Sequence, residues 1–130
     1  MSTEIKVVGF SGATYSYWTT DEGSMWLDVP ANYLWITWTS QGWTIKYAGE
    51  ADALATRFGN HERWAEAVRD YGVTHVVTRI NQGGVNARRA EERDIIRLHN
   101  PPMNTQHRTI DAAEQMDLAG LALIGRYGNR

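Results

Sequence analysis

The stretch from Tyr33 to Tyr47 reads YLWITWTSQGWTIKY, and it decides the fold. Aromatic and β-branched residues, which favour strands, fill both of its halves. Between the halves, Ser40-Gln41-Gly42 has the small and polar composition of a tight turn. The stretch therefore predicts a β-hairpin whose strands cover Tyr33–Thr39 and Trp43–Tyr47.

A second hairpin is expected upstream of this one. Apolar and aromatic residues recur over Ile5–Phe10 and again over Ala13–Trp18, and the Ser11-Gly12 pair supplies the turn between them. The following residues, 19–32, carry charges, a glycine and a proline. We expect a connection there, with a short extended piece at Met25–Leu27.

Downstream of the Tyr33–Tyr47 hairpin, helices alternate with one more strand. Asp52 is expected to cap a short helix that ends at Phe58, and Asn60 to cap a second helix that Gly72 ends. Strand composition then returns over Val73–Ile80. This order predicts that helices separate the last strand from the hairpin.

A long helix is predicted over Val85–His99, because Pro101-Pro102 follows it and the residue before a proline disfavours the helical conformation. A last amphipathic helix is predicted over Asp111–Ile124. Together these elements predict an α+β fold: a small antiparallel β-sheet flanked by helices, with an extra N-terminal hairpin and a C-terminal helix.

Size and composition favour one domain. The chain has 130 residues, of which 42% are hydrophobic, enough for a single core. We expect one domain over 1–130, with the hairpin extension at 1–30, the core at 31–106 and the C-terminal helix at 107–130. The absence of cysteine excludes disulfides and thiolate-bound zinc. No apolar run is long enough for a membrane span or a signal peptide, so we expect a soluble cytoplasmic protein.

The formal charge of −2 is unevenly spread along the chain. Residues 57–108 hold nine basic and six acidic side chains, whereas residues 1–56 hold two basic and six acidic ones. All nine basic residues in the middle are arginines, whose planar fork suits phosphate contacts. The alternative is that most of them are solvated helix-face residues, as expected for Arg63, Arg69, Arg93 and Arg97.

Tryptophan is unusually frequent. Five of the six tryptophans lie in predicted strand regions, namely Trp18, Trp26, Trp35, Trp38 and Trp43. Because a small sheet needs bulky side chains for its core, we expect core packing for most of them, rather than stacking on a ligand. Trp35 and Trp38 are three residues apart, so they face opposite sides of a regular strand, and one of them is expected at the surface.

Two tripeptides on the predicted hairpin carry a family resemblance. Ala31-Asn32-Tyr33 and Tyr47-Ala48-Gly49 resemble the paired tripeptides of the GIY-YIG nucleases, in which two tyrosines lie on adjacent strands. Arg57 follows Tyr47 by ten residues and His61 follows four residues later, in positions similar to those of the family. The first tripeptide departs from the family by its alanine and asparagine, and the second by its alanine.

The resemblance continues into the predicted long helix. Glu92-Arg93-Asp94-Ile95-Ile96 resembles the family's Glu-x-x-Leu-Ile helix, and Pro101 with Asn104 resembles its Pro-x-x-Asn segment. The similarity covers roughly residues 31–106. One further departure is Glu50, whose negative charge would oppose phosphate binding unless the side chain is paired or points away.

The resemblance implies a phosphodiesterase that hydrolyses DNA, with the active site on the hairpin and its neighbours. Tyr33 would be the general base and Tyr47 would lie beside it. Arg57 would stabilise the phosphate, and His61 would share proton transfer, although a histidine at a helix start is also a common surface residue. Asn104 would brace the site by hydrogen bonding. A tyrosine of ordinary pKa, about 10, needs nearby positive charge to act as a base at neutral pH.

Glu92 would hold the metal. Isoleucines at i+3 and i+4 put its carboxylate beside an apolar face, where a cation has to meet it. A single carboxylate with several waters suits Mg²⁺, and Mn²⁺ is the alternative. Two other readings stay open: an ordinary helix salt bridge from Glu92 to Arg88 or Arg89, and a register in which Glu91 is the ligand.

The sequence thus predicts a metal-dependent endonuclease. Its rival is a catalytically weak or inactive module of the same fold that binds nucleic acid or protein. The third class, a structural protein built on a tryptophan-rich sheet, would leave the spacing of the tyrosines, Arg57, Glu92 and Asn104 to coincidence. Gly49 is expected to let the chain turn after the second strand. The DNA target, the pathway and the oligomeric state stay open, with a second copy of the chain or a partner protein as candidates for targeting.

Overall fold

The computed structural model describes residues 2–19, 28–59 and 63–104. Within these residues, its strands are β1 (Glu4–Val8), β2 (Thr14–Thr19), β3 (Ala31–Thr39), β4 (Gly42–Ala51) and β5 (His75–Ile80). Its helices are α1 (Leu54–Gly59), α2 (Trp64–Tyr71) and α3 (Val85–His99). The α+β class predicted from the sequence is confirmed, and the bounds of α3 agree with the predicted helix.

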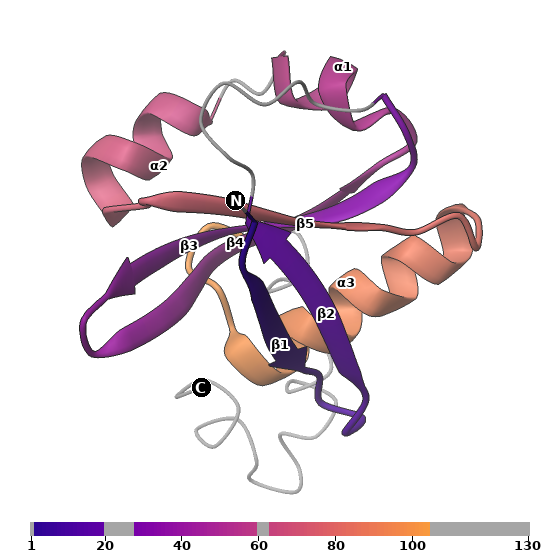
Figure 1. Cartoon of the computed structure of the whole chain (residues 1–130), viewed down its shortest axis with the longest axis horizontal. Coiled ribbons are helices and arrows are strands. Elements are labelled where there is room, and N and C mark those ends of the chain that lie inside the picture. Colours follow the sequence, from indigo (N-terminus) through magenta and orange to yellow (C-terminus); the bar gives the residue numbers. More distant parts are fainter. Residues whose placement is uncertain (1, 20–27, 60–62, 105–130) are drawn as a thin grey trace, which may run out of the picture.

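All five strands form one antiparallel sheet in the order β1-β2-β5-β3-β4 (Figure 1). β3 lies between β4 and β5, so the aromatic hairpin is completed by a strand that follows two helices in the chain. The N-terminal hairpin joins the same sheet because β2 pairs with β5, with Trp18 opposite Thr78. β4 is left at one edge of the sheet.

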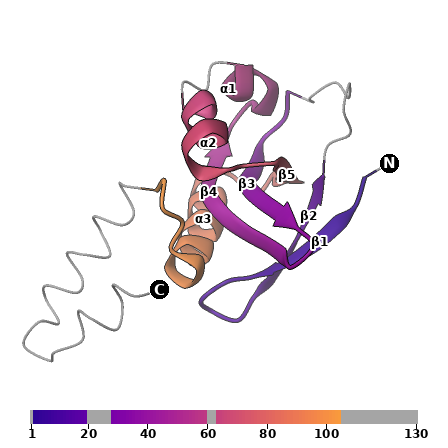
Figure 2. The ribbon, with the colours of Figure 1, turned by 90° about the vertical axis from the view of Figure 1, so that its left-hand side faces the viewer.

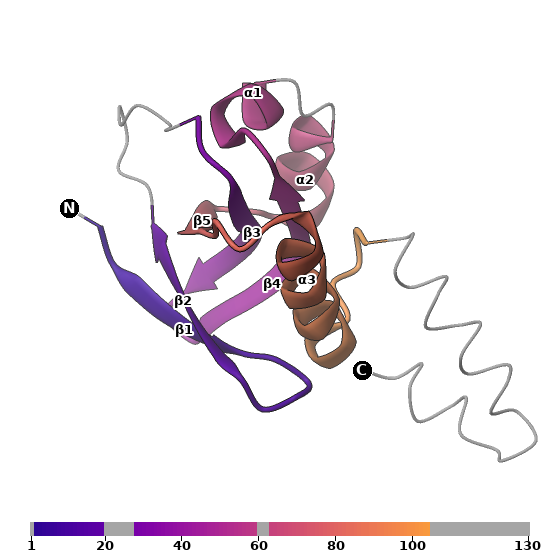
Figure 3. The same ribbon diagram turned by 90° about the vertical axis from the view of Figure 1, so that its right-hand side faces the viewer.

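The helices cover opposite faces of this sheet. α1 and α2 lie on one side of it and α3 on the other (Figure 1). Leu54 of α1 and Ala67 of α2 pack with Tyr33, whereas Ile95 and Ile96 of α3 pack with the other face of the sheet. The side views place the β1–β2 hairpin beside α3 and away from α1 and α2 (Figures 2 and 3).

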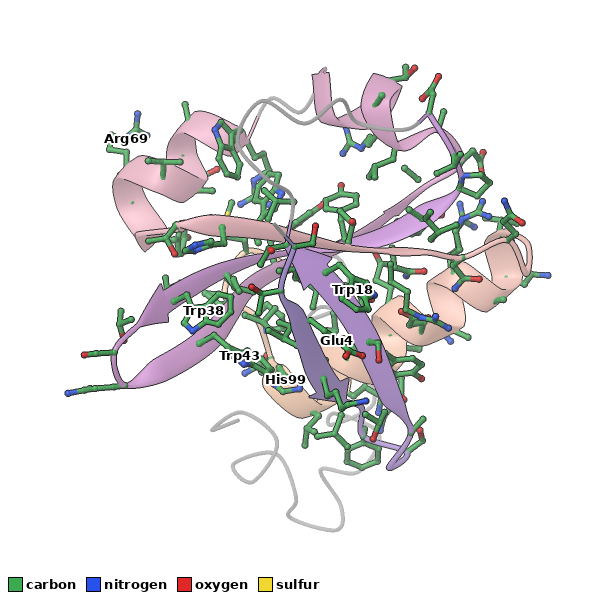
Figure 4. The ribbon with its side chains drawn as sticks, in the orientation of Figure 1. Glu4, Trp18, Trp38, Trp43, Arg69 and His99 are labelled. Carbon is green, nitrogen blue, oxygen red and sulfur yellow. The ribbon has the colours of Figure 1, made fainter. Side chains whose placement is uncertain are left out.

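The tryptophans divide between these faces as the strand period requires. Trp35 is fully buried beside the tyrosines, and Trp38 packs half-buried on the α3 face, so the pair does face opposite ways. Trp43 is also half-buried, 6.3 Å between ring centroids from His99 at the end of α3 (Figure 4). Trp18 is 46% exposed and is therefore an exception to the core packing expected for most of the tryptophans.

The first turn of α1 is capped from a distant part of the chain. The Oδ1 atom of Asp28 accepts a hydrogen bond from the Thr56 amide at 3.1 Å, and its Oδ2 accepts one from the Thr56 hydroxyl at 3.1 Å. The predicted cap, Asp52, instead accepts a hydrogen bond from Arg88 of α3. The end of α2 follows the prediction, since Gly72 adopts the left-handed conformation at φ 69°.

Several predictions fall outside the described residues. They are the helix over Asp111–Ile124, the extended piece at Met25–Leu27, the cap at Asn60 and the site residue His61. Within the described ranges, no helix has the length and apolar character needed to cross a membrane.

Replacing Asp28 with alanine is expected to destabilise the fold by about 1 kcal/mol, the usual effect of losing a helix N-cap. Urea denaturation measures this change in the free energy of unfolding. The control is Asp70→Ala, because Asp70 forms only an exposed ion pair with Arg69, and such pairs contribute little. Equal destabilisation by the two substitutions would contradict the capping role.

Candidate functional site

A pocket of about 460 Å³ lies at the β4 edge of the sheet. No described strand lies beyond β4. Side chains from α1 on one face of the sheet and from α3 on the other therefore meet at this edge. The lining side chains come from β3, β4, α1 and α3, and include four of the residues predicted from the sequence. The lining residues are Tyr33, Tyr47, Gly49, Glu50, Arg57, Arg89, Glu92 and Arg93.

Tyr33 enters this pocket across a glycine. Gly49 is its partner on the neighbouring strand, and a Cβ added to Gly49 would lie 2.5 Å from the Tyr33 hydroxyl oxygen. The phenol ring therefore occupies the space of the missing side chain. This corrects the expectation of a turn at Gly49, because the residue lies within β4 and its function is to admit the ring.

The two tyrosines share the pocket with Arg57. Their ring centroids are 6.1 Å apart, and both Tyr47 and Arg57 are close enough to the Tyr33 phenol to change its pKa. Burial raises the pKa of Tyr33, Tyr47 raises it further, and Arg57 lowers it only in part. Burial also raises the pKa of Tyr47, and the negative charge of Glu92 adds to this rise. Both phenols therefore hold their protons at neutral pH.

Glu92, and not Glu91, faces the tyrosines. Glu92 is 7% exposed and lines the pocket. Glu91 lies on the sheet side of α3, where its Oε2 accepts a hydrogen bond from the Tyr17 hydroxyl at 2.6 Å. Its Oε1 accepts hydrogen bonds from Arg79 and Asn81, both at 3.1 Å. Of the two helix registers left open by the sequence, the geometry selects the one with Glu92 in the pocket.

Glu50 lines the pocket but is paired. Its carboxylate lies 3.0 Å from Nε of Arg88 and 3.7 Å from Nε of Arg89. Arg88 is almost fully buried and also pairs with Asp52. From the sequence, the negative charge of Glu50 was expected to oppose phosphate binding unless it is paired. Two guanidinium groups pair with it.

Asn104 lies behind the site. Its side-chain Oδ1 accepts a hydrogen bond from the amide of Ala48 at 2.8 Å, and its Nδ2 donates one to the Ala48 carbonyl at 2.7 Å. Ala48 lies on the edge strand, so the asparagine amide takes the place of a neighbouring strand for this residue. It holds β4 between Tyr47 and Gly49, which is a bracing position outside the pocket lining.

Sequence reasoning missed the side chains that fix α3 to the sheet. Asn32 is fully buried, donates a hydrogen bond to the Arg88 carbonyl at 2.9 Å and accepts one from Asn81 at 2.9 Å. In the sequence, Asn32 stands out only as a departure from the family tripeptide. A polar residue within a strand that is otherwise apolar was the available signal, because such a group has to find partners.

The pocket chemistry fits a hydrated divalent cation held by few protein ligands. Among the described residues, no group of three or more histidine, cysteine, aspartate or glutamate side chains is arranged to hold a metal ion. Glu92 nevertheless supplies a buried carboxylate beside an open volume. Mg²⁺ retains several waters and binds through one or two carboxylates together with phosphate oxygens, so this donor set fits it.

Comparison with known proteins does not place the chain in a family. None of the protein-family models, curated proteins or solved structures with which the chain was compared matches it. The resemblance carried by the tyrosine tripeptides therefore rests on the residues alone.

Replacing Gly49 with alanine is expected to force Tyr33 out of its position and to destabilise the protein by about 1–3 kcal/mol, as overpacking usually does. Denaturant unfolding measures this difference. In a Tyr33→Ala background the ring is absent, so the same glycine substitution should then have a much smaller effect. An equal effect in both backgrounds would exclude the proposed contact.

The raised pKa values of Tyr33 and Tyr47 predict a loss of stability in alkali. Above the unfolded pKa of about 10, the folded state retains phenolic protons that the unfolded chain loses, so stability falls as pH rises. Each group contributes up to about 1.4 kcal/mol per pH unit. Tyr33→Phe removes one such group, so its free energy of unfolding should fall less steeply above pH 10. Parallel curves for the variant and the wild type would contradict a raised pKa of Tyr33.

Proposed function

We propose that this chain is a metal-dependent endonuclease of the GIY-YIG type that hydrolyses DNA phosphodiester bonds. One observation carries the proposal: Tyr33, Tyr47, Arg57 and Glu92, which lie on four different elements, line one pocket. Their spacing in the sequence resembles that of the family, and their spatial convergence is an independent reason to group them. The β3–β4 hairpin, the helices after it, β5 and α3 would then form the catalytic unit.

Phosphodiester hydrolysis adds water to phosphorus and breaks one bridging P–O bond, while negative charge grows on the phosphate oxygens. Arginine donors oppose that charge. Arg57 lies beside Tyr33, and Arg89 with Arg93 lines the α3 side of the same pocket. The lining holds three arginines and two glutamates, a formal excess of one positive charge. The pocket thus suits an anionic substrate despite the acidic chain.

Tyr33 would orient the attacking water. Its side chain is buried and its ring packs against Gly49, so the phenol is held in place before substrate binds. Because its pKa is raised, Tyr33 can accept the proton of the water only when the pocket holds more positive charge than Arg57 alone provides. A Mg²⁺ or Mn²⁺ ion bound by Glu92 would supply that charge and would polarise the phosphate.

Nicking of supercoiled plasmid tests the function. The wild type should convert the plasmid to the open circular form with Mg²⁺ or Mn²⁺ and should not do so in EDTA. Glu92→Gln and Arg57→Gln should each lower the rate by a factor on the order of 10²–10³, since each removes a charge that acts on the transition state. Double-strand cutting by one site would require a second copy of the chain or two successive nicks.

The matched controls carry the same chemical changes away from the pocket. Glu4→Gln alters a carboxylate on β1, and Arg69→Gln alters an exposed guanidinium on α2 (Figure 4). Both should nick at the wild-type rate. An inactive wild type with every metal would favour the binding-module alternative, and undiminished cutting by Glu92→Gln would exclude Glu92 as the metal ligand.

A further inference from the structure

A second pocket, of about 570 Å³, lies between α3 and the N-terminal hairpin. It receives side chains from the turn and second strand of the hairpin, from β5 with the residue after it, and from α3. Its polar lining residues are Ser11, Tyr15, Arg79, Asn81, Glu91, Arg93, Asp94 and Arg97. Apart from Arg93, the proposed catalytic function uses none of these residues.

The two pockets share Arg93, so they are neighbours along α3. Arg89 lines the first pocket and Arg97 the second, and the three arginines follow one another at intervals of four residues. Residues four apart lie on the same face of a helix. The outer face of α3 therefore carries a continuous row of guanidinium groups that begins at the candidate active site and ends beside the hairpin.

The acidic groups of the second pocket are already bound by the protein. Glu91 accepts hydrogen bonds from Tyr17, Arg79 and Asn81. Asp94 accepts hydrogen bonds from the Ser11 amide at 2.8 Å, the Ser11 hydroxyl at 2.7 Å and the Tyr15 hydroxyl at 2.8 Å. These carboxylates fix the hairpin to α3, and the lining still holds three arginines against two acids, a formal excess of one positive charge.

Aromatic rings of the hairpin also order the arginines. The guanidinium carbon of Arg97 lies 5.0 Å from the ring centroid of Phe10, and that of Arg79 lies 5.8 Å from the ring centroid of Tyr15. An arginine held against a ring loses less side-chain freedom when it binds a further anion. The hairpin, which is an extension to the motif-bearing core, thus prepares this surface for phosphate groups.

We propose that Arg93 and Arg97, with the pocket between α3 and the N-terminal hairpin, bind the DNA backbone next to the phosphate that is cut. From Arg89 to Arg97 the row extends roughly 12 Å along the helix axis, at 1.5 Å per residue. This length equals about three to four nucleotides of one strand at 3.4 Å each. The statement that the bound backbone lies next to the cut phosphate rests on the proposed function. The binding of DNA by these arginines does not.

Fluorescence anisotropy with a short labelled DNA duplex tests this surface without cleavage, in EDTA and over a series of salt concentrations. Arg97→Gln should weaken binding and should lower the slope of log K against log salt by about 0.9, the value for one lost phosphate contact. The double variant Arg93→Gln with Arg97→Gln should lower the slope by roughly twice as much. Arg97→Lys keeps the charge and should retain most of the slope.

Arg69→Gln is the matched control, since Arg69 projects from α2 on the other side of the sheet from α3 (Figure 4). If Arg97→Gln and Arg69→Gln give the same affinity and slope, the surface does not bind DNA. Thermal melting checks that Arg97→Gln folds, and Arg93→Gln alone provides the same test if it does not. If the wild type nicks DNA but Arg97→Gln binds DNA as the wild type does, only this inference is overturned. If Arg97→Gln weakens binding but the wild type does not nick, only the catalytic function is overturned.

Discussion

The register between β3 and β4 is the constraint on which the site depends. Tyr33 faces Gly49 and Trp35 faces Tyr47, so both phenols point to the same side of the sheet. The side-chain period of a strand is two, so a slip of one residue between β3 and β4 would place the two tyrosines on opposite faces of the sheet. Gly49 makes the observed register specific, because any amino acid with a Cβ at position 49 would clash with the Tyr33 ring.

The site also depends on the position of α3 along its own axis relative to the sheet. Glu91 and Glu92 are adjacent, yet one is hydrogen-bonded toward the sheet and the other lines the pocket. Asn32 ties β3 to the Arg88 carbonyl, and Arg88 ties the same turn of the helix to Glu50 on β4. Buried polar groups of this kind are costly when any one partner is lost, so they specify a single helix position.

The elements that neighbouring residues decide could be predicted from the sequence, and the contacts that distant residues decide could not. The bounds of α3 follow from its local composition and from Pro101-Pro102, and the hairpins follow from their turns. The cap of α1 could not be predicted, because Asp28 and Thr56 are 28 residues apart and nothing local links them. Trp18 is exposed for a related reason, since only the assembled sheet determines which strands the helices leave uncovered.

The acidic net charge looks unfavourable for a protein that would bind DNA, but position matters more than the sum. Screening limits exposed charges to a range of about 10 Å, so a phosphate in the pocket is affected mainly by the groups around it. Around the two neighbouring pockets, Glu50 and Glu91 are paired with arginines, and Asp94 is hydrogen-bonded to the hairpin. Glu92 lies beside the tyrosines, where a divalent cation would reverse the effect of its charge on the substrate. The same acids that make the chain negative therefore hold the arginines in position around the proposed phosphate site.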